Sequence, residues 1–154
     1  MKGEPKVIVA LNEILAGELA AINQYFLHAR IFKHHGFEKL AEKVYKESFD
    51  EMNHAQALID RILYLEGTPS IQGPLPIVVG ANVPAQLNAD LTAEREAIAR
   101  IGAGIELCQK ASDHGSREML EKMLRAEEEH FEWLEIQLGL INEFGKETYL
   151  AQQI

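Results

Sequence analysis

Two copies of a Glu-x-x-His motif are the residues of this sequence best suited to chemistry. Glu51 and His54 form the first copy, and Glu127 and His130 form the second. Residues three apart lie on one helix face, about 300° around the axis at 3.6 residues per turn, so each pair can reach one metal ion. A single copy arises often by chance on a solvent-facing helix, whereas two copies on core-facing helix seams favour a metal site.

Glu18 and Glu94 are single carboxylates within two other apolar helical patterns. An unpaired carboxylate in an apolar core is unfavourable and takes up a proton or finds a partner. Four carboxylates in one region would repel each other unless divalent cations neutralised them. One Glu from each of two helices with Glu-x-x-His from two others is the general ligand pattern of ferritin-like di-iron bundles, and our assignment is a match to that pattern.

The two halves of the chain carry equivalent motifs, so we expect Glu51 and Glu127 to bridge two metal ions. The remaining ligands would be Glu18 with His54 at one metal ion and Glu94 with His130 at the other. Oxygen and imidazole ligands without thiolate favour iron or manganese over copper.

Tyr25 and Trp133 are aromatic residues close to these ligands in the helical pattern. Tyr25, about two turns after Glu18, could hydrogen-bond a ligand or relay an electron, or it could be an ordinary core tyrosine. Trp133, one turn beyond His130, has the same alternatives, and simple packing is favoured.

Helical periodicity predicts four long helices and a short tail helix. We expect them at residues 5–35, 38–66, 82–113, 116–144 and 146–153. Pro5 suits a first turn and Gly36 a helix end, while Gly67 is expected to end the second helix. Asn82 and Ser116 are the expected N-caps of the third and fourth helices.

The connection at residues 67–81 is much longer than the other two. It contains Pro69, Pro74 and Pro76. A long connection can cross the length of a bundle, so helices 38–66 and 82–113 are expected to run parallel. The sequence therefore predicts an all-α, ferritin-like four-helix bundle of two antiparallel hairpins with a long crossover, in a single domain at 1–154.

The composition limits the partners and the compartment. Among 154 residues, 24 acidic and 15 basic side chains give a net charge of -9, which argues against nucleic acid and suits cations. No apolar run approaches the roughly 20 residues that span a bilayer, so no membrane partner is expected. Charged residues interrupt the N-terminal apolar stretch, which argues against a secretory signal, and the single Cys108 excludes an intramolecular disulfide. We therefore expect a cytoplasmic protein.

A second apolar stripe on helix 38–66 predicts another protein surface. It comprises Tyr45, Phe49, Met52, Ile59 and Leu63, with a partial match in Ala16, Leu19 and Phe26 of the first helix. A symmetric dimer would bury both faces. Met52 points about 130° away from the Glu51–His54 face. It either packs in the dimer or, if two copies meet across the two-fold axis, supplies both axial thioether ligands of a haem.

The whole chain resembles the bacterioferritin family. The resemblance is carried by GELAAINQYFLHAR, ESFDEMNHAQALIDRILYLEG and LRAEEEHFEWLEIQLGLI, and Met52 within EMNH separates this family from haem-free ferritins. It implies a homo-oligomeric cage of twenty-four subunits, with haem b held between two subunits by Met52 and the tail helix at the four-fold pores. It also implies iron storage, with Fe(II) oxidised by O2 or H2O2 at an intra-subunit ferroxidase centre and haem-assisted release, a ferredoxin being the expected reductant. The implied ferroxidase ligands are Glu18, Glu51, His54, Glu94, Glu127 and His130.

Two positions depart from the family pattern. Some members have a histidine at position 46 that binds an additional iron with Asp50, whereas this chain has Lys46. Leu58 replaces a tyrosine found in some relatives. Neither change affects a predicted ferroxidase ligand.

Three alternatives stay open. A di-iron peroxidase or oxygenase of the rubrerythrin type has the same ligand pattern, although one cysteine leaves no room for the appended Cys-x-x-Cys domain of the peroxidases. A non-catalytic bundle or cage subunit would keep its stability on chelation. A mixed cage with a second subunit type would leave these motifs unchanged.

Overall fold

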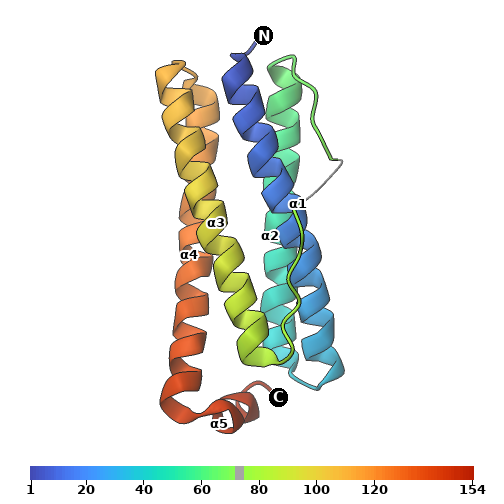
Figure 1. Cartoon of the computed structure of the whole chain (residues 1–154). Coiled ribbons are helices and arrows are strands. Elements are labelled where there is room, and N and C mark those ends of the chain that lie inside the picture. The colour runs from blue at the N-terminus through green and yellow to red at the C-terminus, as the bar shows by residue number, and fades with distance from the viewer. Residues whose placement is uncertain (72–74) are drawn as a thin grey trace.

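The computed structural model describes residues 1–71 and 75–154, and within these ranges every regular element is a helix (Figure 1). The elements are α1 (Pro5–His34), α2 (Glu38–Tyr64), α3 (Val83–Lys110), α4 (His114–Phe144) and α5 (Lys146–Ala151). The all-α prediction is therefore confirmed. None of the described helices is long and apolar enough to cross a membrane.

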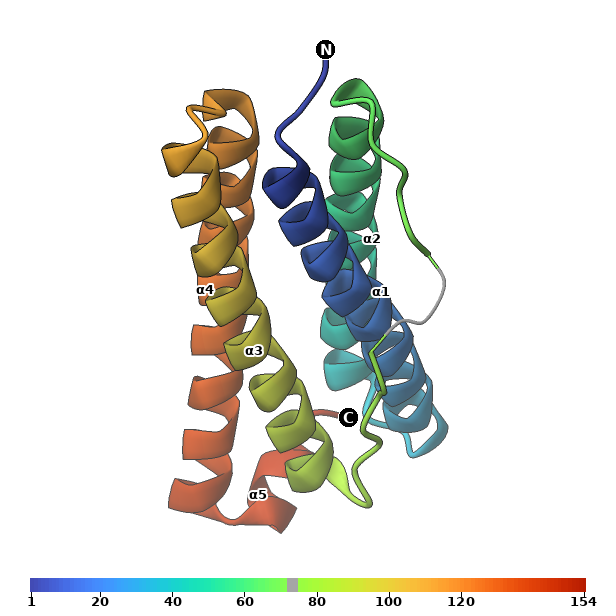
Figure 2. The same ribbon diagram turned by 45° about the horizontal axis from the view of Figure 1, so that its top comes forward.

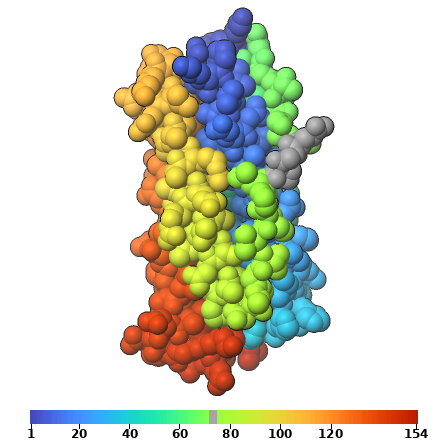
Figure 3. Space-filling model, in the orientation of Figure 1, coloured from blue at the N-terminus to red at the C-terminus, as the bar shows by residue number. Residues whose placement is uncertain are grey.

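The helices form two antiparallel hairpins, α1–α2 and α3–α4, which pack side by side (Figures 1 and 2). The crossover returns along the length of the bundle, so α2 and α3 run parallel, as predicted. Its second half lies between α1 and α3 on the surface (Figure 3). Pro74, one of the three predicted crossover prolines, lies outside the described residues.

Three helices end in the same left-handed turn, but only one of them uses glycine there. Gly36 (φ 84) follows α1, Glu66 (φ 62) follows α2 and Ser112 (φ 55) follows α3. In each case the next amide donates to the carbonyl five residues back, as Gly67 does to Ile62 at 2.8 Å. The predicted ends at 66 and 113 are therefore too long, because a glutamate and a serine adopt the conformation for which glycine is the usual signal.

The start of α4 also differs from the prediction. Asp113, not Ser116, is the N-cap: its carboxylate accepts a hydrogen bond from the Ser116 amide at 3.0 Å, and the helix begins at His114. Asn82 caps α3 as predicted, accepting from the Ala85 amide at 3.0 Å. The tail helix α5 is shorter than predicted and ends at Ala151.

Two apolar clusters fill the bundle, one in each half. The first contains Val7, Leu11, Ile14, Leu15, Leu58, Ile62, Ile101, Cys108, Leu120 and Met123. The second contains Tyr25, Ala29, Phe32, Leu40, Val44, Val83, Leu87, Leu134 and Tyr149. On each long helix the residues between these two groups include a buried carboxylate. The core is therefore divided at mid-height by a polar layer.

Close packing of α3 uses small residues in addition to isoleucine. Ile98 and Ile105 are only partly buried, while Ala97 and Gly104 are buried. A Cβ atom at Gly104 would lie 2.9 Å from Ile14 Cδ1 and 3.1 Å from Leu120 Cδ1, so a larger residue would require these two side chains to shift.

Candidate metal centre

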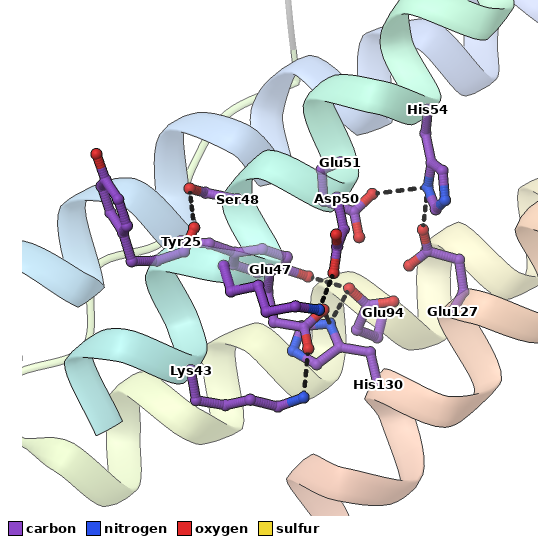
Figure 4. Close-up of polar contacts among 12 residues, drawn as sticks. Tyr25, Lys43, Glu47, Ser48, Asp50, Glu51, His54, Glu94, Glu127 and His130 are labelled. Atoms are coloured by element: carbon purple, nitrogen blue, oxygen red, sulfur yellow. Dashed lines mark hydrogen bonds and ion pairs between the residues drawn. The ribbon is translucent and has the colours of Figure 1, made fainter. Parts of the chain in front are cut away.

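The polar layer brings all six predicted ligands together. Glu18, Glu51, Glu94 and Glu127 come from α1, α2, α3 and α4 respectively, and each is at most 2% exposed. His130 is also buried, and His54 is partly buried at the edge of the layer. Figure 4 shows carboxylates and imidazoles from α2, α3 and α4 converging on one point. Helical periodicity explains this, because one apolar seam per helix faces the same axis.

The ligands divide into two groups of four that could each hold a metal ion. The first group is Glu18, Glu51, His54 and Glu127, and the second is Glu51, Glu94, Glu127 and His130. Within each group the ligand atoms lie within 4.8 Å of one another. Glu51 and Glu127 belong to both groups, which is the geometry that two bridging carboxylates require.

His54 lies among three carboxylates. Its Nδ1 atom is 2.9 Å from Glu127 Oε1, 3.3 Å from Glu51 Oε2 and 3.5 Å from Glu18 Oε2. None of these approaches has hydrogen-bond geometry. The nitrogen is therefore close to three carboxylate groups without a hydrogen bond to any of them.

His130 has a closer partner. Its Nδ1 atom lies 2.8 Å from Glu94 Oε1, and the Tyr25 hydroxyl donates to the same oxygen. Tyr25 therefore hydrogen-bonds a predicted ligand, which is one of the roles expected for it from the sequence. Trp133 stacks on the His130 ring, with centroids 6.1 Å apart.

Unsatisfied buried atoms concentrate in this layer. Among the described residues, those without a hydrogen-bond partner are Glu18 Oε2, Glu51 Oε2, His54 Nδ1, Glu94 Oε2, both Glu127 oxygens, His130 Nε2 and Asp90 Oδ2. All but Asp90 are predicted ligands. Buried polar atoms without partners cost free energy, and a divalent cation would satisfy the carboxylates at once. The residues present therefore fit a pair of metal ions.

The same crowding shifts the pKa values. Burial, with help from the Glu18 charge, raises the pKa of Glu51 well above its usual value. Burial and then the neighbouring Glu127 raise the pKa of Glu94 to about 8, although His130 opposes the shift. Burial alone would lower the pKa of His54, but Glu127 and Glu18 outweigh it and raise the pKa to about 10. Without metal, the layer therefore retains protons at neutral pH.

Met52 lies on a different face of α2. It is 49% exposed, whereas its neighbour Glu51 is 2% exposed. Phe26, Tyr45 and Phe49 are exposed as well, and the Tyr45 ring lies 6.1 Å from Phe26 and 5.1 Å from Phe49. These four residues, here called the apolar patch, span α1 and α2.

A second buried polar network was not singled out from the sequence. Asp90 Oδ1 lies 2.8 Å from His28 Nδ1 and accepts from Gln24 at 2.9 Å. The amides of Val78 and Gly80 in the crossover donate to Gln24 and His28. The signal for it was the four-residue spacing of Gln24 and His28 on the inner face of α1.

Lys46 and Leu58, the two departures from the family pattern, lie on the surface and in the core respectively. Lys46 forms a surface ion pair with Asp50, at 3.3 Å. The Lys46 ammonium therefore lies beside the Asp50 carboxylate, which an additional metal ion would need as a ligand. Leu58 is fully buried in the first apolar cluster.

The chain is similar to known proteins along its whole length. A family model described as a ferritin-like domain matches residues 8–144. The chain is 48% identical over 155 residues to a bacterial ferritin of Pseudomonas aeruginosa, with all of both chains covered. It is 47% identical to a bacterioferritin of Mycobacterium leprae, covering 99% of this chain and 96% of the relative. It is also 47% identical to a bacterioferritin of Streptomyces coelicolor, covering 100% of this chain and 92% of the relative.

Proposed function

Because the chain belongs to the bacterioferritin family, we propose that it stores iron and oxidises Fe(II) at the centre formed by its six buried ligands. The observation that carries the proposal is the sharing of Glu51 and Glu127 by two groups of four potential ligands. Two ferrous ions bound there as substrate would each give one electron to O2 or H2O2.

Each of the six ligands has a role that follows from its position in the two groups. Glu51 and Glu127 hold the two ions at a short separation. Glu18 with His54 completes one coordination set, and Glu94 with His130 completes the other. The Tyr25 hydroxyl fixes the orientation of the Glu94 carboxylate. The apolar clusters shield the ligands from solvent at the two faces of the polar layer, which strengthens the attraction of the ligands for cations.

The assembly and the second cofactor are also part of the proposal. The apolar patch is the surface through which two chains would pair, with the two Met52 thioethers as axial ligands of one haem b. Such dimers would build a cage of twenty-four chains around the stored ferric iron. A second subunit type in the cage and a ferredoxin as reductant are compatible with this arrangement. A cytoplasmic location is supported by the single, buried Cys108.

Two alternatives are less well supported. A purely structural bundle would not place seven unsatisfied polar atoms of six ligands at its centre. A rubrerythrin-type peroxidase or oxygenase shares the ligand set, but the three relatives described above are named bacterioferritin or bacterial ferritin.

The deciding experiment compares Fe(II) oxidation in wild type and Glu18→Ala. Two ferrous ions per chain are added without oxygen, air is admitted, and ferric absorbance is followed. Loss of a metal ligand should slow the fast phase by at least about tenfold. Glu13→Ala, which removes an exposed carboxylate from the same helix, should oxidise iron like wild type. Equal rates in wild type and Glu18→Ala would refute the proposed centre.

A further inference from the structure

Glu47 is a buried carboxylate that belongs to neither group of four ligands. It lies one turn before Glu51 on α2 and is 6% exposed. Its Oε2 atom is 3.6 Å from His130 Nδ1, which is too far for a hydrogen bond but close enough for electrostatic attraction. A buried carboxylate needs a counter-charge, and Lys43 provides it.

Lys43 contacts two of the groups that adjoin the His130 ring, Glu47 and Trp133, while Tyr25 and Glu94 contact the ring from other helices. Its ammonium lies 2.7 Å from Glu47 Oε1 and 5.2 Å from the centroid of the Trp133 ring. The Trp133 ring is nearly parallel to that of His130, at an angle of 28°. Lys43 and Glu47 are seen beside His130 in Figure 4. One cation therefore holds a carboxylate and an indole that both touch the same imidazole.

His130 is buried, but it also lines a pocket. A pocket of about 360 Å³ between α2 and α4 is lined by residues that include Lys43, Glu47, Glu51 and His130. An imidazole beside a pocket has room to rotate away from its ligand position. Its orientation therefore depends on the groups packed around it.

We propose that Lys43 is a positioning residue that keeps His130 directed at Glu94 and Glu127 by holding Glu47 and Trp133 against it. This inference rests on the proposed function, since it assumes that His130 binds a metal ion. Groups that orient a metal ligand typically change metal affinity by about 10–100-fold when removed. Without the ammonium, Glu47 loses its counter-charge and competes with His130 for the metal ion.

Anaerobic titration of the metal-free protein with Co²⁺, followed by visible absorption, tests the proposal. Wild type should bind two equivalents per chain. In Lys43→Met, one equivalent should bind about tenfold more weakly with an altered spectrum, and the other should be unchanged. Lys43→Arg retains the cation and should restore most of the affinity and the wild-type spectrum. Lys46→Met is the matched control, because Lys46 is exposed and forms its ion pair with the partly exposed Asp50 rather than with Glu47.

The possible outcomes separate the inference from the function. If Lys43→Met binds both equivalents with wild-type affinity and spectrum, the positioning role is refuted and the metal centre stands. If wild type itself does not bind two Co²⁺, the proposed centre fails and the inference fails with it. Glu47→Gln provides a second variant should Lys43→Met not fold, and it should weaken the same equivalent.

Discussion

The protonation of Glu94 and His54 in the metal-free chain follows from what surrounds them. Burial and neighbouring Glu127 raise the pKa of Glu94 to about 8, while the carboxylates around His54 overcome its burial and raise its pKa to about 10. Protons thereby neutralise part of a charge cluster that metal ions would otherwise neutralise. Metal binding must displace these protons, so metal affinity should increase with pH.

Thermal unfolding measured at a series of pH values tests whether protons and metal ions compete for these residues. Glu94 binds more protons in the folded than in the unfolded state between pH 4.5 and about 8, and His54 does so between pH 6.5 and about 10. The free energy of unfolding therefore falls as pH rises through both windows. In chelator, the melting temperature should decrease from pH 6 to pH 9. Two equivalents of Co²⁺ should make the melting temperature depend less on pH. A melting temperature that rises from pH 6 to pH 9 in chelator would contradict the prediction.

At the scale of the elements, the crossover is held by hydrogen bonds to buried side chains of α1. Gly80 donates to Nε2 of His28, and Nδ1 of His28 then donates to Asp90 on α3. Gln24 binds Asp90 and accepts from Val78. One network thus joins α1, α3 and the crossover, next to the contact between Tyr25 and Glu94.

Replacing His28 by leucine should loosen the crossover. The substitution keeps the volume but leaves Asp90 and the Gly80 amide without this partner, at a cost of about 1–3 kcal/mol. Denaturant unfolding should measure this loss, and hydrogen exchange should accelerate at Val78 and Gly80. His35→Leu, at an exposed position after α1, should change neither. Unchanged exchange in His28→Leu would show that other contacts hold the crossover.

The whole molecule has an exposed apolar surface that one chain cannot bury. The apolar patch carries a methionine and three aromatic side chains, each between 41% and 49% exposed. Large contiguous apolar surfaces of this kind usually mark interfaces. Both groups of candidate metal ligands, in contrast, come from a single chain. Pairing of chains and metal binding should therefore be separable.

The substitution Met52→Leu should separate haem binding from the pairing of chains and from metal binding. Leucine preserves apolar area and helix propensity but removes the thioether sulfur, so the variant should lose haem while retaining assembly and binding of two Co²⁺. Haem absorption after reconstitution, sedimentation and Co²⁺ titration measure the three properties. Met123→Leu, in the first apolar cluster, is the control and should keep its haem. Wild-type haem absorption in Met52→Leu would exclude Met52 as the axial ligand.

The sequence by itself was sufficient for the features that depend on spacing within one helix. The 3.6-residue period places Glu51 with His54, and Glu127 with His130, on single faces, and the apolar residues around them direct those faces to the core. The long crossover determines the parallel direction of α2 and α3. The fold class and the identity of the candidate ligands therefore follow from local pattern, while their role in iron oxidation stays a prediction.

Only the tertiary structure decided the features that depend on distances between helices. The contacts of Lys43 and Glu47 with His130 and Trp133 link α2 to α4, and the network of His28 and Asp90 links α1 to α3. No periodicity within one helix specifies which side chains meet across an interface. The helix ends needed the structure for a related reason. Glu66 and Ser112 adopt a left-handed conformation that their residue types do not signal, and this conformation lets the next amide hydrogen-bond to the carbonyl of Ile62 or Cys108.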